Sequence, residues 1–277
     1  MMFPKIPLDV WVEWFVKWLD KYFGILFDIT SDVIGGTVDF FSFLLHLPPS
    51  IVIILIFSIL AYFTGRWPIA IFTFVGLIFI DNLGYWDQTM STLALVLTSA
   101  LISIIFGIPI GILCAKKNTI QHLIMPVLDF MQTMPAFVYL IPAIIFFGLG
   151  EVPGVIASVI FAIPPTIRLT NLGIRQVPKD LVEAADAFGS TPGQKLMKLQ
   201  LPLAVPTIMA GINQTIMLSL SMVVIASMIG AKGLGAEVYR AVTQIKTGEG
   251  FEAGLAVVIL AIMLDRITQN IVKQNKN

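Results

Sequence analysis

Long, uninterrupted apolar runs constrain this chain more than any other feature of its sequence. The clearest are residues 93–115 and 203–229, and each is long enough to cross the bilayer core, which needs about 20 residues. Because the runs are continuous and not alternating, they predict helices and not the strands of a membrane barrel. Only 12% of the residues are charged, against roughly 25% in soluble domains. The sequence therefore predicts an all-α integral membrane protein.

We expect about seven membrane-spanning helices. The predicted spans are residues 50–64, 67–80, 93–115, 135–149, 152–169, 203–229 and a last short one that begins with 254–264. Arg66 lies between the first two runs, and an arginine is costly at mid-bilayer. We therefore place Arg66 in a tight turn between two spans. If residues 50–80 formed a single span instead, the N-terminus would change sides.

The N-terminal region predicts a helix that lies in the membrane surface. Over residues 3–27 the apolar side chains recur at helical spacing, opposite a charged face. The apolar face comprises Trp11, Trp14, Phe15, Trp18, Tyr22 and Leu26. Tryptophan and tyrosine favour the membrane–water boundary, so we expect an amphipathic interfacial helix. Residues 28–46 continue this region, and Gly35-Gly36 predicts a break in it.

Basic residues in short loops predict the orientation, because such loops face the cytoplasm. The polar segment between the fifth and sixth predicted spans carries Arg168, Arg175, Lys179, Lys195 and Lys198. With seven spans, Arg66, Lys116-Lys117 and the C-terminal tail fall on the same side. We therefore expect a cytoplasmic C-terminus and an external N-terminus.

The polar segment at residues 172–202 predicts a helix–turn–helix. In its first helix, four residues at positions i, i+3, i+4 and i+7 form one apolar stripe. They are Leu181, Ala184, Ala185 and Phe188. Pro178 suits the first helical position, and Gly189 predicts the helix stop.

The second helix of this segment begins with a predicted capping box. Thr191 is the cap, Pro192 follows at the first helical position, and Gln194 stands three residues after the cap. Pro202 is expected to end this helix or to bend it into the following span.

This segment resembles the EAA motif of ABC importer permeases, in which it docks an ATPase. The matching residues are Glu183, Ala184, Ala185, Gly189, Leu199, Leu201 and Pro202, and Leu199 stands where isoleucine is often found. The glycine-rich residues 229–235 resemble the segment that follows in such permeases. The resemblance implies a five-helix permease core at 89–272, with a coupling loop at 172–202. An N-terminal region (1–49) and two additional helices (50–88) precede it.

The remaining sequence narrows the resemblance to one group of importers. The N-terminal extension, the two added spans, and residues 131–137 and 174–178 resemble the permeases of bacterial glycine betaine/proline betaine importers, the OpuA type of Gram-positive bacteria. Permeases for choline or carnitine in the same family stay open as alternatives.

The resemblance also implies partners and residue roles. Two copies of the permease would form a homodimer in the plasma membrane, two ATP-binding subunits would dock on the coupling loops, and an external binding protein would deliver the substrate. Glu183 would anchor the ATPase, Ala184 and Ala185 would permit close packing, and Gly189 would allow the sharp turn. ATP and Mg²⁺ would bind to the partner ATPase, with no cofactor on this chain.

Several functions are excluded or disfavoured by missing patterns. The sequence has no Gly-x-x-x-x-Gly-Lys-Ser/Thr, so the phosphate-binding loop must lie on another chain, and we expect no enzyme activity here. The two histidines, His46 and His122, lack partners at metal-ligand spacing. The single Cys114 lies in an apolar run and is interpreted as packing. The net charge is zero, which disfavours nucleic-acid binding.

Polar side chains within the 203–229 span are candidates for the translocation path. They are Asn213, Thr215 and Ser219, with Met222 on the same face as the last two. Polar groups in spans usually face a bundle interior or water, but hydrogen bonding between helices explains them equally well. A transporter working without ATP remains a second hypothesis. It would be expected to show internal repeats and intramembrane charges, and neither is evident.

Overall fold

The computed structural model describes residues 7–274, and these confirm the all-α fold class. The helices are α1 (Leu8–His46), α2 (Ser50–Asn82), α3 (Trp86–Lys116), α4 (Asn118–Thr133), α5 (Ala136–Phe147), α6 (Glu151–Arg175), α7 (Lys179–Ala187), α8 (Pro192–Lys195), the π-helical turn η1 (Leu196–Gln200), α9 (Leu201–Ser227), α10 (Leu234–Thr243) and α11 (Thr247–Gln274). The first residues of the predicted helix at 3–27 and the end of the C-terminal tail lie outside the described residues.

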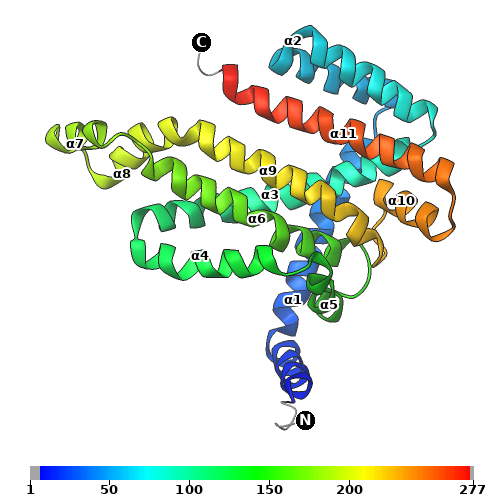
Figure 1. Cartoon of the computed structure of the whole chain (residues 1–277), viewed down its shortest axis with the longest axis horizontal. Helices are drawn as coiled ribbons and strands as arrows, with labels where there is room; N and C mark the ends of the chain where they lie inside the picture. The colour runs from blue at the N-terminus through cyan, green and yellow to red at the C-terminus, as the bar shows by residue number, and fades with distance from the viewer. Residues whose placement is uncertain (1–6, 275–277) are drawn as a thin grey trace.

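Helices α3, α6 and α9 run side by side along the long axis of the molecule and form its centre (Figure 1). Glycines let these helices approach closely, as is common where membrane helices pack. A Cβ atom on Gly111 of α3 would lie 2.6 Å from Cβ of Thr170 on α6, and one on Gly211 of α9 would lie 3.0 Å from the carbonyl oxygen of Pro165. Close packing of the helix backbones therefore stabilises the core, in addition to the burial of apolar side chains.

The predicted apolar runs lie largely in helices of the structure, but fewer helices than the seven predicted spans qualify as membrane-crossing among the described residues, and α11 is not one of them. By length and composition, four helical stretches within the described residues are able to cross a membrane: α2, α3, α6 and the continuous run Pro192–Ser227. The bent pair α4 and α5 makes a fifth if it is counted as one broken span. Two of the predicted spans lie within α2, and the last predicted run lies in α11.

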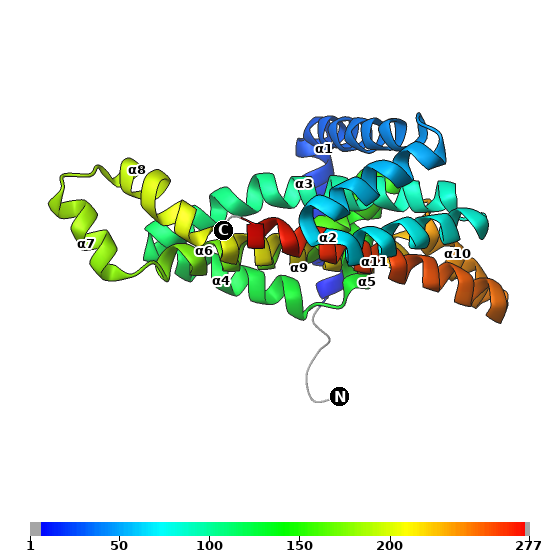
Figure 2. The same ribbon diagram turned by 90° about the horizontal axis from the view of Figure 1, so that it is seen from above.

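The predicted turn at Arg66 is confirmed. Arg66 has φ 62° and ψ −168° inside α2, which divides this element into two arms of about 16 residues, or roughly 24 Å each at 1.5 Å per residue. The arms fold back on one another, and α2 packs against α11 (Figure 2). Gly76 permits this contact, since a Cβ there would lie 2.6 Å from the Ile259 side chain.

The predicted break at Gly35-Gly36 is wrong, because α1 continues through both glycines to His46. Gly35 faces α6, where an added Cβ would lie 3.6 Å from the Val152 side chain. Ile34 and Val38 on the same stretch are buried against Leu95 of α3 and neighbouring residues. Tertiary packing of this half of α1 outweighs the helix-breaking tendency of glycine, which is about 1 kcal/mol per residue.

The predicted span at 135–149 is a shorter helix, α5, that meets α4 at an angle of 100°. Pro135 explains the bend, because a residue before proline is driven out of helical conformation. Met134 accordingly has an extended conformation with ψ 137°. An ion pair of 2.5 Å between Arg168 and Asp129 ties α4 to α6.

Candidate functional site

The polar segment between α6 and α9 projects from one end of the central helices. Helices α7 and α8 lie at the far end of the long axis in both views (Figures 1 and 2). Helix α10 lies toward the opposite end. The segment is thus accessible to a partner at this end of the molecule.

The predicted apolar stripe of α7 is directed outward. Phe188 is 91% exposed and Leu181 is 44% exposed, while Ala184 is exposed and Ala185 is half-buried. The exposed part of this stripe, Leu181, Ala184 and Phe188, is not covered by another element of the described residues. Pro178 is the N-cap and not the first helical residue, so the predicted start was wrong by one position.

The predicted turn after α7 is confirmed in its details. Gly189 has φ +76°, the left-handed conformation that glycine adopts without strain. The Thr191 hydroxyl accepts a hydrogen bond from the Gln194 N–H, and the Gln194 side chain accepts one from the Thr191 N–H. This capping box, with Pro192 as the next residue, fixes the start of the second helix.

An ion pair that the sequence analysis did not predict joins the two short helices. Nζ of Lys195 lies 2.7 Å and 2.8 Å from the two carboxylate oxygens of Asp186. The Lys195 side chain is mostly covered, and Asp186 is half exposed. The i,i+3 and i,i+4 spacings predict ion pairs only between residues of one helix. They therefore could not predict a pair between residues on either side of a turn.

Charge reversal tests this ion pair. If this segment docks an ATPase, as the EAA resemblance implies, Lys195→Asp should weaken that binding because it places two carboxylates together across the turn. Asp186→Lys should do the same with two ammonium groups. The stability cost of an exposed pair is small, about 1 kcal/mol or less, so the effect should appear in ATPase co-purification and not in membrane insertion. The double variant Asp186→Lys/Lys195→Asp should restore co-purification, and failure to restore it would argue against a structural role for the pair.

The predicted end of the helix at Pro202 is not observed, and the alternative of a bend there stays a prediction. The helix runs on from Pro192 to Ser227, and residues Leu196–Gln200 form a π-helical turn in which the Leu201 N–H bonds to the Leu196 carbonyl. Proline lacks an N–H, and proline and single π turns are the usual places where long helices depart from regular α-helical geometry. Leu196 is buried, while Leu199 and Leu201 are half-buried, so this half of the motif is anchored on the bundle.

Arg175 anchors the base of the segment. Its guanidinium donates hydrogen bonds to the Cys114 carbonyl (2.7 Å), the Asn118 side chain (2.8 Å) and the Asn171 side chain (2.9 Å). These groups belong to the end of α3, the start of α4 and α6. In the sequence, Arg175 indicated orientation and belonged to the 174–178 resemblance, and neither pattern predicted this structural role.

A small cleft lies beside this anchor. Its volume is about 200 Å³, and it is lined by Ala115, Ile174, Arg175, Val177, Lys179, Val182, Glu183 and Gln200. Glu183 of the motif therefore borders a cleft that also contains two basic side chains. Such a cleft is able to receive a polar side chain from a partner.

The candidate path residues lie at contacts between helices of this chain. The Thr215 hydroxyl lies 2.7 Å from both the Thr166 hydroxyl and the Ala162 carbonyl of α6. Asn213 donates to the Asp265 carboxylate at 2.9 Å and accepts from Thr268 of α11. Met222 and Ser219 are buried. These contacts favour helix–helix bonding for Asn213 and Thr215, and a role in the path stays a prediction.

The glycine-rich residues 229–235 form most of the tight connection between α9 and α10 and the first two residues of α10. Gly230 and Gly233 both have positive φ angles, +96° and +121°. The Leu234 N–H donates to the Thr92 hydroxyl of α3 at 2.8 Å, so the loop is fixed to the core. Within the part of the chain that the structure describes, no group of three or more His, Cys, Asp or Glu side chains is placed to hold a metal ion.

Comparison with known proteins identifies the family. Residues 107–274, which include all of α7, α8 and η1, match the family described as binding-protein-dependent transport system inner membrane component. The chain belongs to this family. It is therefore a multi-pass membrane component of a transporter, as the resemblance of the polar segment implied.

Two relatives in this family match nearly the whole chain. The glycine betaine transport system permease protein OpuAB of Bacillus subtilis is 58% identical over 99% of this chain and 97% of its own length. The glycine betaine/carnitine transport permease protein GbuB of Listeria monocytogenes is 55% identical over 99% of this chain and 98% of its own. Their similarity extends through α1 and α2, which precede the family match.

A solved structure supports the fold of the permease core. The chain resembles an inward-facing conformation of the MetNI methionine ABC transporter with a TM-score of 0.60 and 21% identity, over 66% of this chain and 92% of that one. At this identity the likeness establishes the fold alone.

Proposed function

We propose that this chain is the permease subunit of an ATP-driven importer that moves glycine betaine into the cell. The observation that carries the proposal is the projecting α7–turn–α8 segment, on which Leu181 and Phe188 of the apolar stripe and Glu183 and Ala184 of the EAA-type motif are exposed. An exposed apolar helix face at the end of a membrane bundle is suited to a soluble partner. ATP hydrolysis resides on that partner, because the chain lacks a phosphate-binding loop.

The segment conveys the motion of the ATPase to the central helices. Arg175 holds the start of the segment on the ends of α3 and α4, and the continuous run Pro192–Ser227 carries its other end into the core. A displacement of α7 would therefore be transmitted to α6 and α9. Two permease copies, each with one ATPase subunit, form the complete pathway, and an external binding protein delivers the substrate.

The orientation follows from the basic residues. Lys116-Lys117 end α3, and Lys179, Lys195 and Lys198 lie in the projecting segment, so this end of the molecule faces the cytoplasm. The C-terminal end of α11 lies toward the same side of the molecule as α7 and α8 (Figure 1). The N-terminus lies outside, with the tryptophan-rich half of α1 in the membrane surface.

The proposed substrate is based on the substrates that appear in the names of the two relatives. Both full-length relatives are named for glycine betaine, and one of them also for carnitine. Proline betaine, choline and carnitine are the competing substrates, since all carry a quaternary ammonium group. A transporter that works without ATP is the competing mechanism.

Uptake by vesicles that hold the whole complex tests the proposal. When the binding protein is present, addition of ATP should drive accumulation of labelled glycine betaine in the vesicles. Unlabelled choline should compete only weakly for this uptake. An ATPase subunit should co-purify with the permease. Uptake that proceeds without ATP, or a permease that binds no ATPase, would favour the secondary transporter. Preferred uptake of choline would revise the substrate only.

A further inference from the structure

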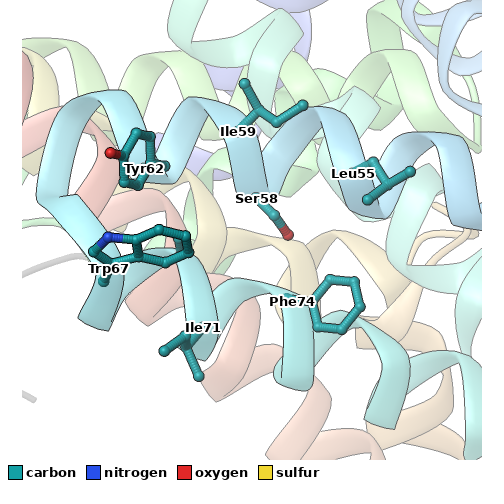
Figure 3. A pocket seen from close by; sticks show the side chains of 8 residues that line it. Leu55, Ser58, Ile59, Tyr62, Trp67, Ile71 and Phe74 are labelled. Atoms are coloured by element: carbon teal, nitrogen blue, oxygen red, sulfur yellow. The ribbon is translucent and has the colours of Figure 1, made fainter.

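The two arms of α2 enclose an apolar groove. The first arm contributes Leu55, Ser58, Ile59 and Tyr62, and the second contributes Trp67, Ala70, Ile71 and Phe74. The groove has a volume of about 510 Å³, within the range of about 300–1,000 Å³ typical of ligand sites. Figure 3 shows these side chains on facing sides of the hairpin, with the Ser58 hydroxyl directed toward the space between the arms.

The groove is not covered by the helix that packs on α2. Helix α11 contacts the hairpin through Ile259 at Gly76, and the buried residues Leu77 and Ile80 of α2 belong to the same core cluster as Leu260 and Met263 of α11. None of these α2 residues lines the groove. The groove thus opens on a different face of the hairpin.

Inside a membrane, an apolar groove of this size is expected to be occupied by another molecule. The outward-facing side chains of both arms are large and apolar, among them Ile59 and Ile71, and they are exposed. In a membrane protein this outer surface meets hydrocarbon, where water is scarce. An empty groove would deprive its lining of dispersion contacts. A flexible hydrocarbon chain would supply these contacts to the aliphatic and aromatic side chains of the lining, whereas the buried Ser58 hydroxyl, which has no hydrogen-bond partner among the described residues, would stay unpaired.

The turn end of the groove has the side chains expected near a lipid head group. Tyr62 and Trp67 flank the turn with ring centroids 5.0 Å apart, and such aromatic residues favour the depth of the head groups. Arg66 lies between them in sequence and is exposed. Within residues 7–274, its guanidinium has no acidic partner at ion-pair distance. A phosphate group would supply the missing negative charge.

We propose that the α2 hairpin binds one phospholipid, with an acyl chain between its arms and the phosphate at Arg66. The apolar lining holds the chain, and the aromatic pair at the turn sets its depth. The bound lipid completes the packing of a hairpin whose arms are too widely separated to fill the space themselves.

Native mass spectrometry of the full-length chain, purified in a mild detergent and washed, tests this site. The wild-type chain should retain an adduct with the mass of a phospholipid. Ser58→Phe should lose that adduct, because the new ring occupies the groove. Ile56→Phe is the matched control, since Ile56 lies on the same arm, is 45% exposed and does not line the groove. Equal retention by the two variants, or no adduct on the wild type, would overturn the proposal.

Two further variants distinguish loss of the phosphate contact at Arg66 from a loss of folding. Arg66→Gln should lower lipid retention, while Arg66→Lys should preserve most of it, because lysine keeps the charge. Equal lipid retention by the two Arg66 variants would contradict the proposed contact between Arg66 and the phosphate. The alternative occupant is a second copy of this chain. Efficient cross-linking between two copies through Ile59→Cys would show that protein fills the groove, and would contradict lipid binding.

Discussion

Replacing Gly189 by valine should abolish ATP-dependent uptake while leaving the chain inserted in the membrane. Gly189 has φ +76°, and a Cβ atom there would meet no atom within 4 Å. The penalty is therefore conformational and not steric. A left-handed conformation costs an ordinary residue about 1–2 kcal/mol and is worst for β-branched side chains. Valine should reopen the turn and move α7 away from α8.

The matched control is Gly189→Asn, because asparagine tolerates the left-handed conformation. It adds a side chain of similar size in the same open space. We expect near-normal uptake and normal ATPase co-purification for asparagine, and loss of both for valine. Membrane insertion of both variants should match the wild type, as measured by extraction and sedimentation. Full uptake by Gly189→Val would contradict the coupling role of the turn.

Replacing Gly111 by alanine should destabilise the protein, although alanine is the better helix former by about 1 kcal/mol. A Cβ atom there would lie 2.6 Å from Cβ of Thr170 and 2.8 Å from the backbone oxygen of Ile167. Because a backbone atom cannot rotate away, α3 and α6 must separate. Overpacking of this kind costs about 1–3 kcal/mol. The thermal unfolding midpoint of the purified chain should fall.

Gly36→Ala is the control for this effect. Gly36 is also within a helix, but an added Cβ would meet no atom within 4 Å. The same substitution should therefore leave the unfolding midpoint unchanged or raise it slightly, through helix propensity. A fall of equal size for both variants would show that the loss of glycine as such, and not the α3–α6 contact, causes the destabilisation.

Local signals in the sequence were sufficient for much of the candidate site. The stop at Gly189 and the capping box at Thr191 each depend on residues within one turn of helix, so they were predicted correctly. The turn at Arg66 followed from the cost of burying a charge in hydrocarbon. The apolar stripe on α7 followed from helical spacing, and its exposure agrees with a docking surface.

Features that depend on contacts between distant segments were not predictable. The Asp186–Lys195 pair forms because the turn brings two helices together. The hydrogen bonds of Arg175 join three helices. The same limit explains the error at Gly35-Gly36, where packing against α6 keeps α1 helical in spite of two glycines.

The sequence by itself determined that this chain is a helical membrane protein, and it predicted a docking segment for an ATPase, because hydropathy and the EAA-type spacing are local properties. Only the tertiary structure decided how its helices combine: that α2 is a hairpin with an open groove, that α4 and α5 meet at 100°, and that Arg175 anchors the docking segment. The physical reason is that these features arise from close packing and hydrogen bonds between segments far apart in the chain, which no local pattern records.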